Sequence, residues 1–160
     1  MNPVGVGTWI GDWVWGLPLI VLTVVIHVCG LAVIGERVEA IISRMNRRRF
    51  ILKFARVMGT TALLATMLHG FEAFIWASAY RIVGALPDNR AGMLYSLSAM
   101  TTYGHANLFL QDRWQMMGAL EALNGMLLFG LTTAFMFAMM QKSLAVQGAQ
   151  AQHSGNLHAQ

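Results

Sequence analysis

Charged side chains are scarce in this chain of 160 residues, since Asp, Glu, Lys and Arg together make up only 11% of it. Soluble domains usually contain roughly 25% of these residues. Hydrophobic residues, in contrast, make up 56% of the chain. Because a helix needs roughly 20 apolar residues to cross a bilayer, the composition predicts an integral membrane protein with a few spans and short loops. A large multidomain enzyme is excluded.

Several recognisable patterns are also missing. The one cysteine, Cys29, lies within an apolar run, which excludes a disulfide framework or a cysteine-based zinc site within one chain. No His-Glu-x-x-His helix and no phosphate-cradling glycine loop is present, so we expect no enzymatic activity. The absence of internal repeats argues against a single-chain inverted-repeat transporter. No span carries an arginine at every third position, which argues against a voltage sensor of that kind.

Basic residues outnumber acidic ones by 11 to 7, and most of the excess lies in one stretch between two apolar segments. This position is typical of a cytoplasmic loop that sets membrane orientation. Nucleic-acid binding is not expected, because aromatic residues are not interleaved with the basic ones and no binding motif is present. The first residues include Asp12 but no Lys or Arg, so a cleaved secretory signal is not expected either. The basic stretch contains Arg37, Arg44, Arg47, Arg48, Arg49, Lys53 and Arg56.

Three apolar stretches predict membrane-spanning helices at about residues 15–35, 54–79 and 115–141. The tryptophans Trp9, Trp13 and Trp15 mark the outer boundary, where indole rings settle among lipid headgroups. We therefore divide the chain into an outer segment (1–14), two spans with their basic loop (15–83), a third module (84–141) and a disordered cytoplasmic tail (142–160). The N-terminus is expected outside and the C-terminus in the cytoplasm. The compact chain suggests a bacterial inner membrane.

Residues 91–111 contain no charge, yet they are too polar for a helix that faces lipid. We expect a short helix followed by extended polar backbone. Irregular backbone is tolerated at membrane depth only where protein buries it or where it lines a watery cavity. The segment therefore predicts a re-entrant loop. Its polar residues are Ser96, Ser98, Thr101, Thr102, Gly104, His105, Asn107 and Gln111.

The order of pore-type helix, Thr-Thr-x-Gly motif and final span resembles the pore domain of the potassium-channel superfamily over residues 90–140. The family filter reads Thr-Thr-Val-Gly-Tyr-Gly-Asp, and the two threonines and the first glycine match here. The resemblance implies a homotetramer in which four copies of the loop point backbone carbonyls at a shared axis to bind a monovalent cation, potassium in first place. The aligned positions are Thr101, Thr102, Tyr103, Gly104, His105, Ala106 and Asn107.

The resemblance also implies roles for residues outside the filter carbonyls. The Thr102 hydroxyl would form the filter together with the backbone carbonyls of Thr101 to Ala106. Asn107 would lie at the pore mouth. In the final span, Glu121 would support the loop, while Gly125 and Gly130 would permit bending for a gate or close helix approach. No cofactor and no bound metal site are implied.

Three positions depart from the family filter. Ala106 replaces the second glycine, His105 replaces the tyrosine that braces the filter, and Asn107 replaces the acidic residue at the mouth. Glycine matters because positive φ costs a residue with a Cβ roughly 1–2 kcal/mol. A tetramer would also place four titratable imidazoles beside the pore. Strict potassium selectivity therefore does not follow from the resemblance.

Glu72 and Glu121 lie within spans, where carboxylates are costly and are functional candidates by default. His69 shares a helix face with Glu72 at i,i+3 spacing. A structural hydrogen bond near the headgroup boundary explains both glutamates equally well. His27 and His69 are expected at similar depth in antiparallel spans, which raises the alternative of a bound b-type haem. A hydrogen-bonded polar contact is the more ordinary explanation.

We thus predict an all-α membrane protein with three transmembrane helices, a re-entrant pore helix and a filter loop. The predicted function is passive cation conduction by a homotetramer whose partners are copies of itself and membrane lipids. One alternative is a non-conducting assembly or regulatory subunit with the same fold. A more remote alternative is a haem-bearing electron-transfer subunit that uses His27 and His69.

Overall fold

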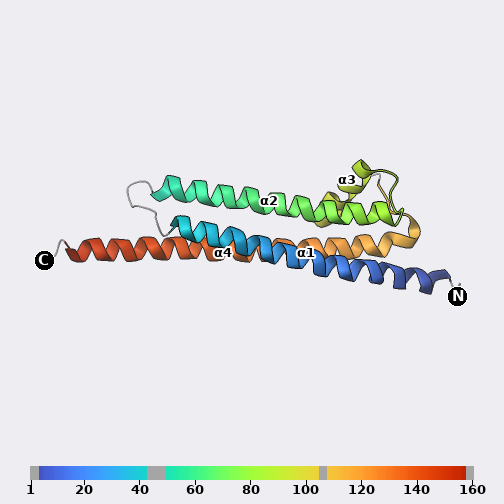
Figure 1. The fold of residues 1–160 in the computed structure, drawn as a ribbon, viewed down its shortest axis with the longest axis horizontal. Coiled ribbons are helices and arrows are strands. Elements are labelled where there is room, and N and C mark those ends of the chain that lie inside the picture. Colours follow the sequence, from blue (N-terminus) through green and yellow to red (C-terminus); the bar gives the residue numbers. More distant parts are fainter. Residues whose placement is uncertain (1–3, 43–49, 105–107, 158–160) are drawn as a thin grey trace. The chain divides into compact units, whose positions relative to one another are not determined.

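A computed structural model describes the backbone over residues 4–42, 50–104 and 108–157, and side chains over 9–42, 51–104 and 108–148. Over these ranges the chain is helical and contains no strand. The elements in order are α1 (Val4–Ile42), α2 (Phe50–Ile82), α3 (Asn89–Met100), the 3₁₀ turn η2 (Asp112–Trp114) and α4 (Gln115–Leu157) (Figure 1). Three helices, α1, α2 and α4, are long and apolar enough to cross a membrane. This confirms an all-helical chain with three candidate spans.

The helices extend beyond the predicted spans. α1 begins at Val4, so most of the predicted outer segment is helical. α4 continues to Leu157, where the sequence predicted a disordered tail over 142–160. Side-chain contacts account for part of this extension, because Ser143 is fully buried and Lys142 pairs with Glu39 at 2.5 Å. Ala and Gln, frequent after Lys142, also have good helix propensity. The arginines 44 and 47–49 of the basic loop lie outside the described residues.

A single narrow stripe of α1 is buried, and its members recur at every third or fourth position. Large apolar residues such as Val21, Leu22 and Val25 are exposed on the other faces. Soluble helices show the reverse pattern, with apolar residues inside and polar ones outside. An apolar exterior around a partly polar interior is suited to lipid. The buried stripe consists of Asp12, Gly16, Leu19, Thr23, His27, Leu31, Gly35, Val38 and Ile42.

The chain forms two compact units, and each takes a part of all three long helices. Unit 1 comprises 1–28 and 67–130, and unit 2 comprises 29–66 and 131–160. The main core of unit 1 is formed by aromatic, aliphatic and small residues of α1, α2, α3 and α4 and of the loops that flank α3. The core of unit 2 is smaller and consists of Val38, Ile42, Val57 and Met139.

The short helix expected within 91–111 is α3, which begins slightly earlier, at Asn89, and lies against α2 within unit 1 (Figure 1). The Asp88 side chain caps its N-terminus by accepting a hydrogen bond from the Ala91 N–H at 2.8 Å. Gly92 lets the helix approach α2 closely, since an added Cβ would meet the Ala77 carbonyl oxygen at 3.3 Å. These contacts fix α3 at the end of α2 and set the position of the residues that follow it.

Candidate pore loop and buried polar clusters

The chain turns sharply at the end of α3. The Thr102 N–H donates to the Ala99 carbonyl at 3.1 Å and the Tyr103 N–H donates to the Ser98 carbonyl at 3.0 Å. This pair of hydrogen bonds forms a Schellman motif with Thr101 as the C-cap. The turn satisfies carbonyls at the end of α3 and is formed by the first residues of the predicted filter.

Thr102 occupies the position of this motif that usually carries glycine. Its φ is +55°, and it is the one non-glycine residue with positive φ in the described part of the chain. A β-branched residue in this region of φ is strained by about 1–3 kcal/mol. Gly104 follows with φ +84°, a conformation that glycine adopts without this penalty. The strained residue therefore lies in the segment that the sequence predicts to be a filter.

The segment from Thr101 to Gly104 is exposed, and Tyr103 retains 87% of its accessible surface. His105, Ala106 and Asn107, which complete the predicted filter, lie outside the described residues.

Two glycines of α4 allow close approach to α3. A Cβ on Gly125 would lie 2.4 Å from the Met100 carbonyl oxygen and 2.6 Å from its Cα, so any side chain would collide with backbone at the end of α3. A Cβ on Gly118 would lie 2.1 Å from the Tyr95 hydroxyl. Gly130 differs, because nothing lies within 4 Å of its added Cβ. Gly125 thus allows α4 to approach the end of α3 closely, which is one of the two roles considered for it.

Glu121 lies behind α3 as a fully buried carboxylate. The Tyr80 hydroxyl of α2 donates a hydrogen bond of 2.6 Å to its Oε2 atom. The ring of Tyr95 from α3 meets the Tyr80 ring edge-on at a centroid distance of 5.4 Å. Burial and the nearby Glu121 carboxylate raise the pKa of Tyr95 to about 12, so its phenol stays protonated at neutral pH. Glu121 of α4 is thus hydrogen-bonded to α2, whose Tyr80 ring contacts Tyr95 of α3, and its support of the loop stays a prediction.

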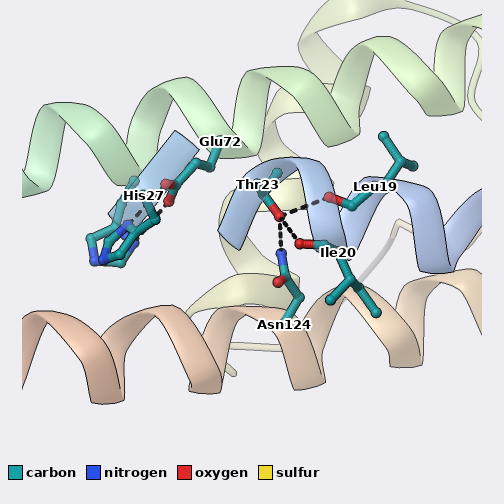
Figure 2. A network of polar contacts seen from close by, with 7 residues as sticks. Leu19, Ile20, Thr23, His27, Glu72 and Asn124 are labelled. Carbon is teal, nitrogen blue, oxygen red and sulfur yellow. Dashed lines mark hydrogen bonds and ion pairs between the residues drawn. The ribbon is translucent and has the colours of Figure 1, made fainter. Parts of the chain in front are cut away.

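Two further polar contacts join α1 to α4 within unit 1. The Asn124 amide donates to the Thr23 hydroxyl at 2.9 Å, and this hydroxyl donates to the Leu19 carbonyl at 2.8 Å (Figure 2). Asp12 accepts a hydrogen bond of 3.3 Å from the Met117 N–H in the first turn of α4. A carboxylate at a helix N-terminus satisfies a free N–H and complements the helix dipole.

A third polar cluster joins α1 to α2. The Glu72 carboxylate lies 2.8 Å from Nδ1 of His27 (Figure 2). It also lies 3.4 Å from Nδ1 of His69. His27 and Glu72 are fully buried, and His69 is 11% exposed. The two imidazole rings lie 4.9 Å apart, and the His69 ring stacks on Phe129 at 4.3 Å. The predicted pairing of His69 with Glu72 and the predicted similar depth of the two histidines are both confirmed.

This geometry does not favour haem. Two axial histidines must each direct a ring nitrogen at the iron from opposite faces of a porphyrin. Here the two imidazole rings are in contact, with their centroids 4.9 Å apart. A porphyrin plane has no room between them.

Some features of the site were not visible in the sequence. Trp76 and Tyr80 of α2 are both fully buried in unit 1. Their spacing from Glu72, at i+4 and i+8, is the one signal that they share its inward face. The cap that Asp12 provides to α4 joins residues 105 positions apart in sequence, and no local pattern indicates it.

Comparison of the chain with protein-family models, with curated proteins and with solved structures finds no match.

Proposed function

We propose that this chain is one subunit of a homotetrameric pore that conducts monovalent cations and resembles the pore domain of potassium channels. In this assignment α3 is the pore helix, residues 101–107 form the filter, and α4 is the inner helix. The observation that carries the proposal is the strained, exposed Thr101–Gly104 turn, held at the end of a short helix between two candidate spans.

The exposure of this turn supports an assembly. Polar backbone between two membrane spans must meet protein or water, because lipid offers no hydrogen bonds. The outer face of α3 is also uncovered in the single chain, with Leu94 at 52% and Leu97 at 40% exposure. Neighbouring subunits around a central axis would cover this face and enclose the turn in a water-filled pore.

The electrostatics of the turn suit a cation. The C-terminal end of a helix carries roughly half a negative charge from its aligned peptide dipoles. α3 ends directly at the exposed turn, so this partial charge is presented where the ion would lie. Neither Lys nor Arg occurs between residues 91 and 112. Cations are therefore favoured over anions at this position.

The contacts behind the turn support a rigid filter. Gly125 and Gly118 seat α3 on α4 by close approach, and Glu121 joins α2 to α4 through Tyr80. A filter built from carbonyl dipoles needs such support, because the ion replaces its hydration shell with fixed oxygen atoms.

The test is cation flux from proteoliposomes loaded with potassium chloride, with sodium or choline outside. The full chain, shown to be tetrameric, is expected to release potassium faster than protein-free vesicles. The double variant His105→Tyr with Ala106→Gly restores the family filter and is expected to raise the potassium-to-sodium flux ratio. The tail contains the same residue pair, so His158→Tyr with Ala159→Gly is a matched control that should leave the ratio unchanged.

Two outcomes would contradict the proposal. Absence of flux for every cation from tetrameric protein would favour the non-conducting assembly subunit. If the filter variant and the tail control conduct with the same potassium-to-sodium flux ratio, ions pass by a route other than residues 101–107.

A further inference from the structure

The cluster of His27, His69 and Glu72 plays no part in the proposed pore. We call it the His–Glu–His cluster. Its three side chains come from α1 and α2 within unit 1, and one ligand-type atom from each lies within 4.8 Å of the other two. It is the one group of this kind in the part of the chain that the structure describes.

We infer that the His–Glu–His cluster binds a divalent transition-metal ion, zinc(II) in first place, through one donor atom each from His27, His69 and Glu72. The ion would connect α1 to α2 in the interior of unit 1. This site does not depend on cation conduction and would exist in a non-conducting assembly as well.

The spacing of the donors fits such an ion. Zinc binds imidazole nitrogen and carboxylate oxygen at about 2.0–2.2 Å in tetrahedral geometry, which puts neighbouring donors roughly 3.3 Å apart. The Glu72 oxygens lie 2.8 Å from Nδ1 of His27 and 3.4 Å from Nδ1 of His69. An ion at the centre of these three donors would replace the hydrogen bond between His27 and Glu72.

The side chains are also held in place before an ion arrives. His69 and Glu72 share one face of α2 at i,i+3 spacing. The Phe129 ring lies nearly parallel to the His69 ring, with an interplanar angle of 16°. Donors whose rotamers are fixed by packing lose little freedom on binding, which favours affinity.

The charge of the cluster favours a cation. Glu72 is fully buried beside His27 and His69, and a buried ionised carboxylate is stabilised by a partner of opposite charge. A divalent ion bound between the three side chains would supply positive charge beside the Glu72 carboxylate.

The donor types select the class of metal. Two imidazoles with one carboxylate suit zinc and other first-row divalent ions, whereas calcium and magnesium prefer oxygen ligands alone. The set contains no thiolate, because Cys29 is exposed and is not one of the three donors. Three protein ligands leave a fourth position for water.

The experiment uses the full chain in detergent without a polyhistidine tag, treated with chelator and then titrated with zinc chloride against a chromogenic chelator. Elemental analysis after desalting should give one zinc per chain. Loss of a second-shell partner typically lowers metal affinity about 10–100-fold, so His69→Gln or Glu72→Gln should lower it by at least about tenfold. Matched controls are Glu121→Gln, another buried glutamate of unit 1, and His153→Gln with His158→Gln in the tail.

A second measurement keeps the test decisive if the variants fold poorly. X-ray absorption on the zinc-loaded wild-type chain should show two imidazole ligands and one carboxylate at about 2.0–2.2 Å. Several results would overturn the inference: no stoichiometric zinc in the wild-type chain, equal affinity in Glu72→Gln, or binding that disappears in the tail variant. The cluster would then be a hydrogen-bonded contact between α1 and α2.

Discussion

The two units of the chain are built from the same three long helices, yet their interiors differ in kind. Unit 1 buries Asp12, Glu72 and Glu121 together with their hydrogen-bond partners. Unit 2 buries an apolar core. Among the residues that the structure describes, its ion pair is that of Lys142 with Glu39, and both side chains are about half exposed. Within unit 2, the hydroxyls of Thr61, Thr66 and Ser143 each donate a hydrogen bond to the carbonyl one turn earlier in the same helix.

The difference shows what fixes helix pairing in an apolar surrounding. Aliphatic contacts between helices differ little from contacts with lipid tails, so they specify position weakly. A buried carboxylate between helices, in contrast, must find a particular donor. Unit 1 therefore has the features expected of the half that holds a defined site. We therefore expect the stability of unit 1 to depend on specific contacts more strongly than the stability of unit 2 does.

The largest effect is expected at Gly125. In Gly125→Ala the new Cβ would lie 2.4 Å from the Met100 carbonyl oxygen, so α3 must move away from α4. Overpacking costs typically about 1–3 kcal/mol and occasionally more, and we expect the upper end here because contact with backbone leaves little room for relief. We expect a marked loss of thermal stability in detergent and loss of cation flux.

Gly130→Ala is the matched control, five positions further along α4. Nothing lies within 4 Å of its added Cβ. Alanine in place of glycine favours a helix by about 1 kcal/mol, so this variant should be as stable as the wild-type chain or more stable. Equal destabilisation by the two substitutions would contradict the close approach assigned to Gly125.

A smaller loss is expected from Tyr80→Phe, which removes the hydrogen bond to Glu121 and leaves a buried carboxylate oxygen without its donor. Such a change costs about 1–3 kcal/mol. Ser143→Ala is the counterpart in unit 2, where the lost hydrogen bond runs to Met139 in the same helix. Chemical unfolding of both variants should show a clear loss for Tyr80→Phe and almost none for Ser143→Ala. Similar losses would mean that the two interiors are not different in kind.

The sequence predicted the features that depend on composition and on local signals. Long apolar runs gave the three candidate spans, and the polar stretch after Asp88 gave the short helix α3. Helical spacing also predicted the contact of His69 with Glu72, because i,i+3 neighbours share a face.

Features that depend on pairing across helices were missed. The sequence shows that Asp12 and Tyr80 are polar or amphipathic but not which partner each one meets. The strain at Thr102 was also invisible, because a Schellman turn usually carries glycine at that position. The extension of α4 past residue 141 depends partly on contacts of Lys142 and Ser143 that the local sequence does not reveal.

Thr102→Gly is expected to remove backbone strain from unit 1. Glycine adopts a φ of +55° freely, so the variant should gain up to about 1 kcal/mol in the free energy of unfolding, although the greater freedom of glycine in the unfolded chain offsets part of this. Thr101→Gly is the control, because Thr101 has an ordinary φ of −88° and should gain nothing. Equal effects of both substitutions would show that Thr102 carries no strain. Chemical unfolding in detergent measures both.

The smallest effect is expected in unit 2, at the ion pair of Lys142 and Glu39. Both side chains are close to half exposed, at 49% and 45%, so water and salt screen their attraction. Exposed pairs contribute about 0–1 kcal/mol, and Lys142→Ala should therefore lower the free energy of unfolding by less than Tyr80→Phe does. The exchange variant Lys142→Glu with Glu39→Lys keeps opposite charges at the two positions and should match the wild-type chain. A loss from Lys142→Ala as large as that from Tyr80→Phe, restored by the exchange variant, would show that unit 2 also depends on a specific polar contact.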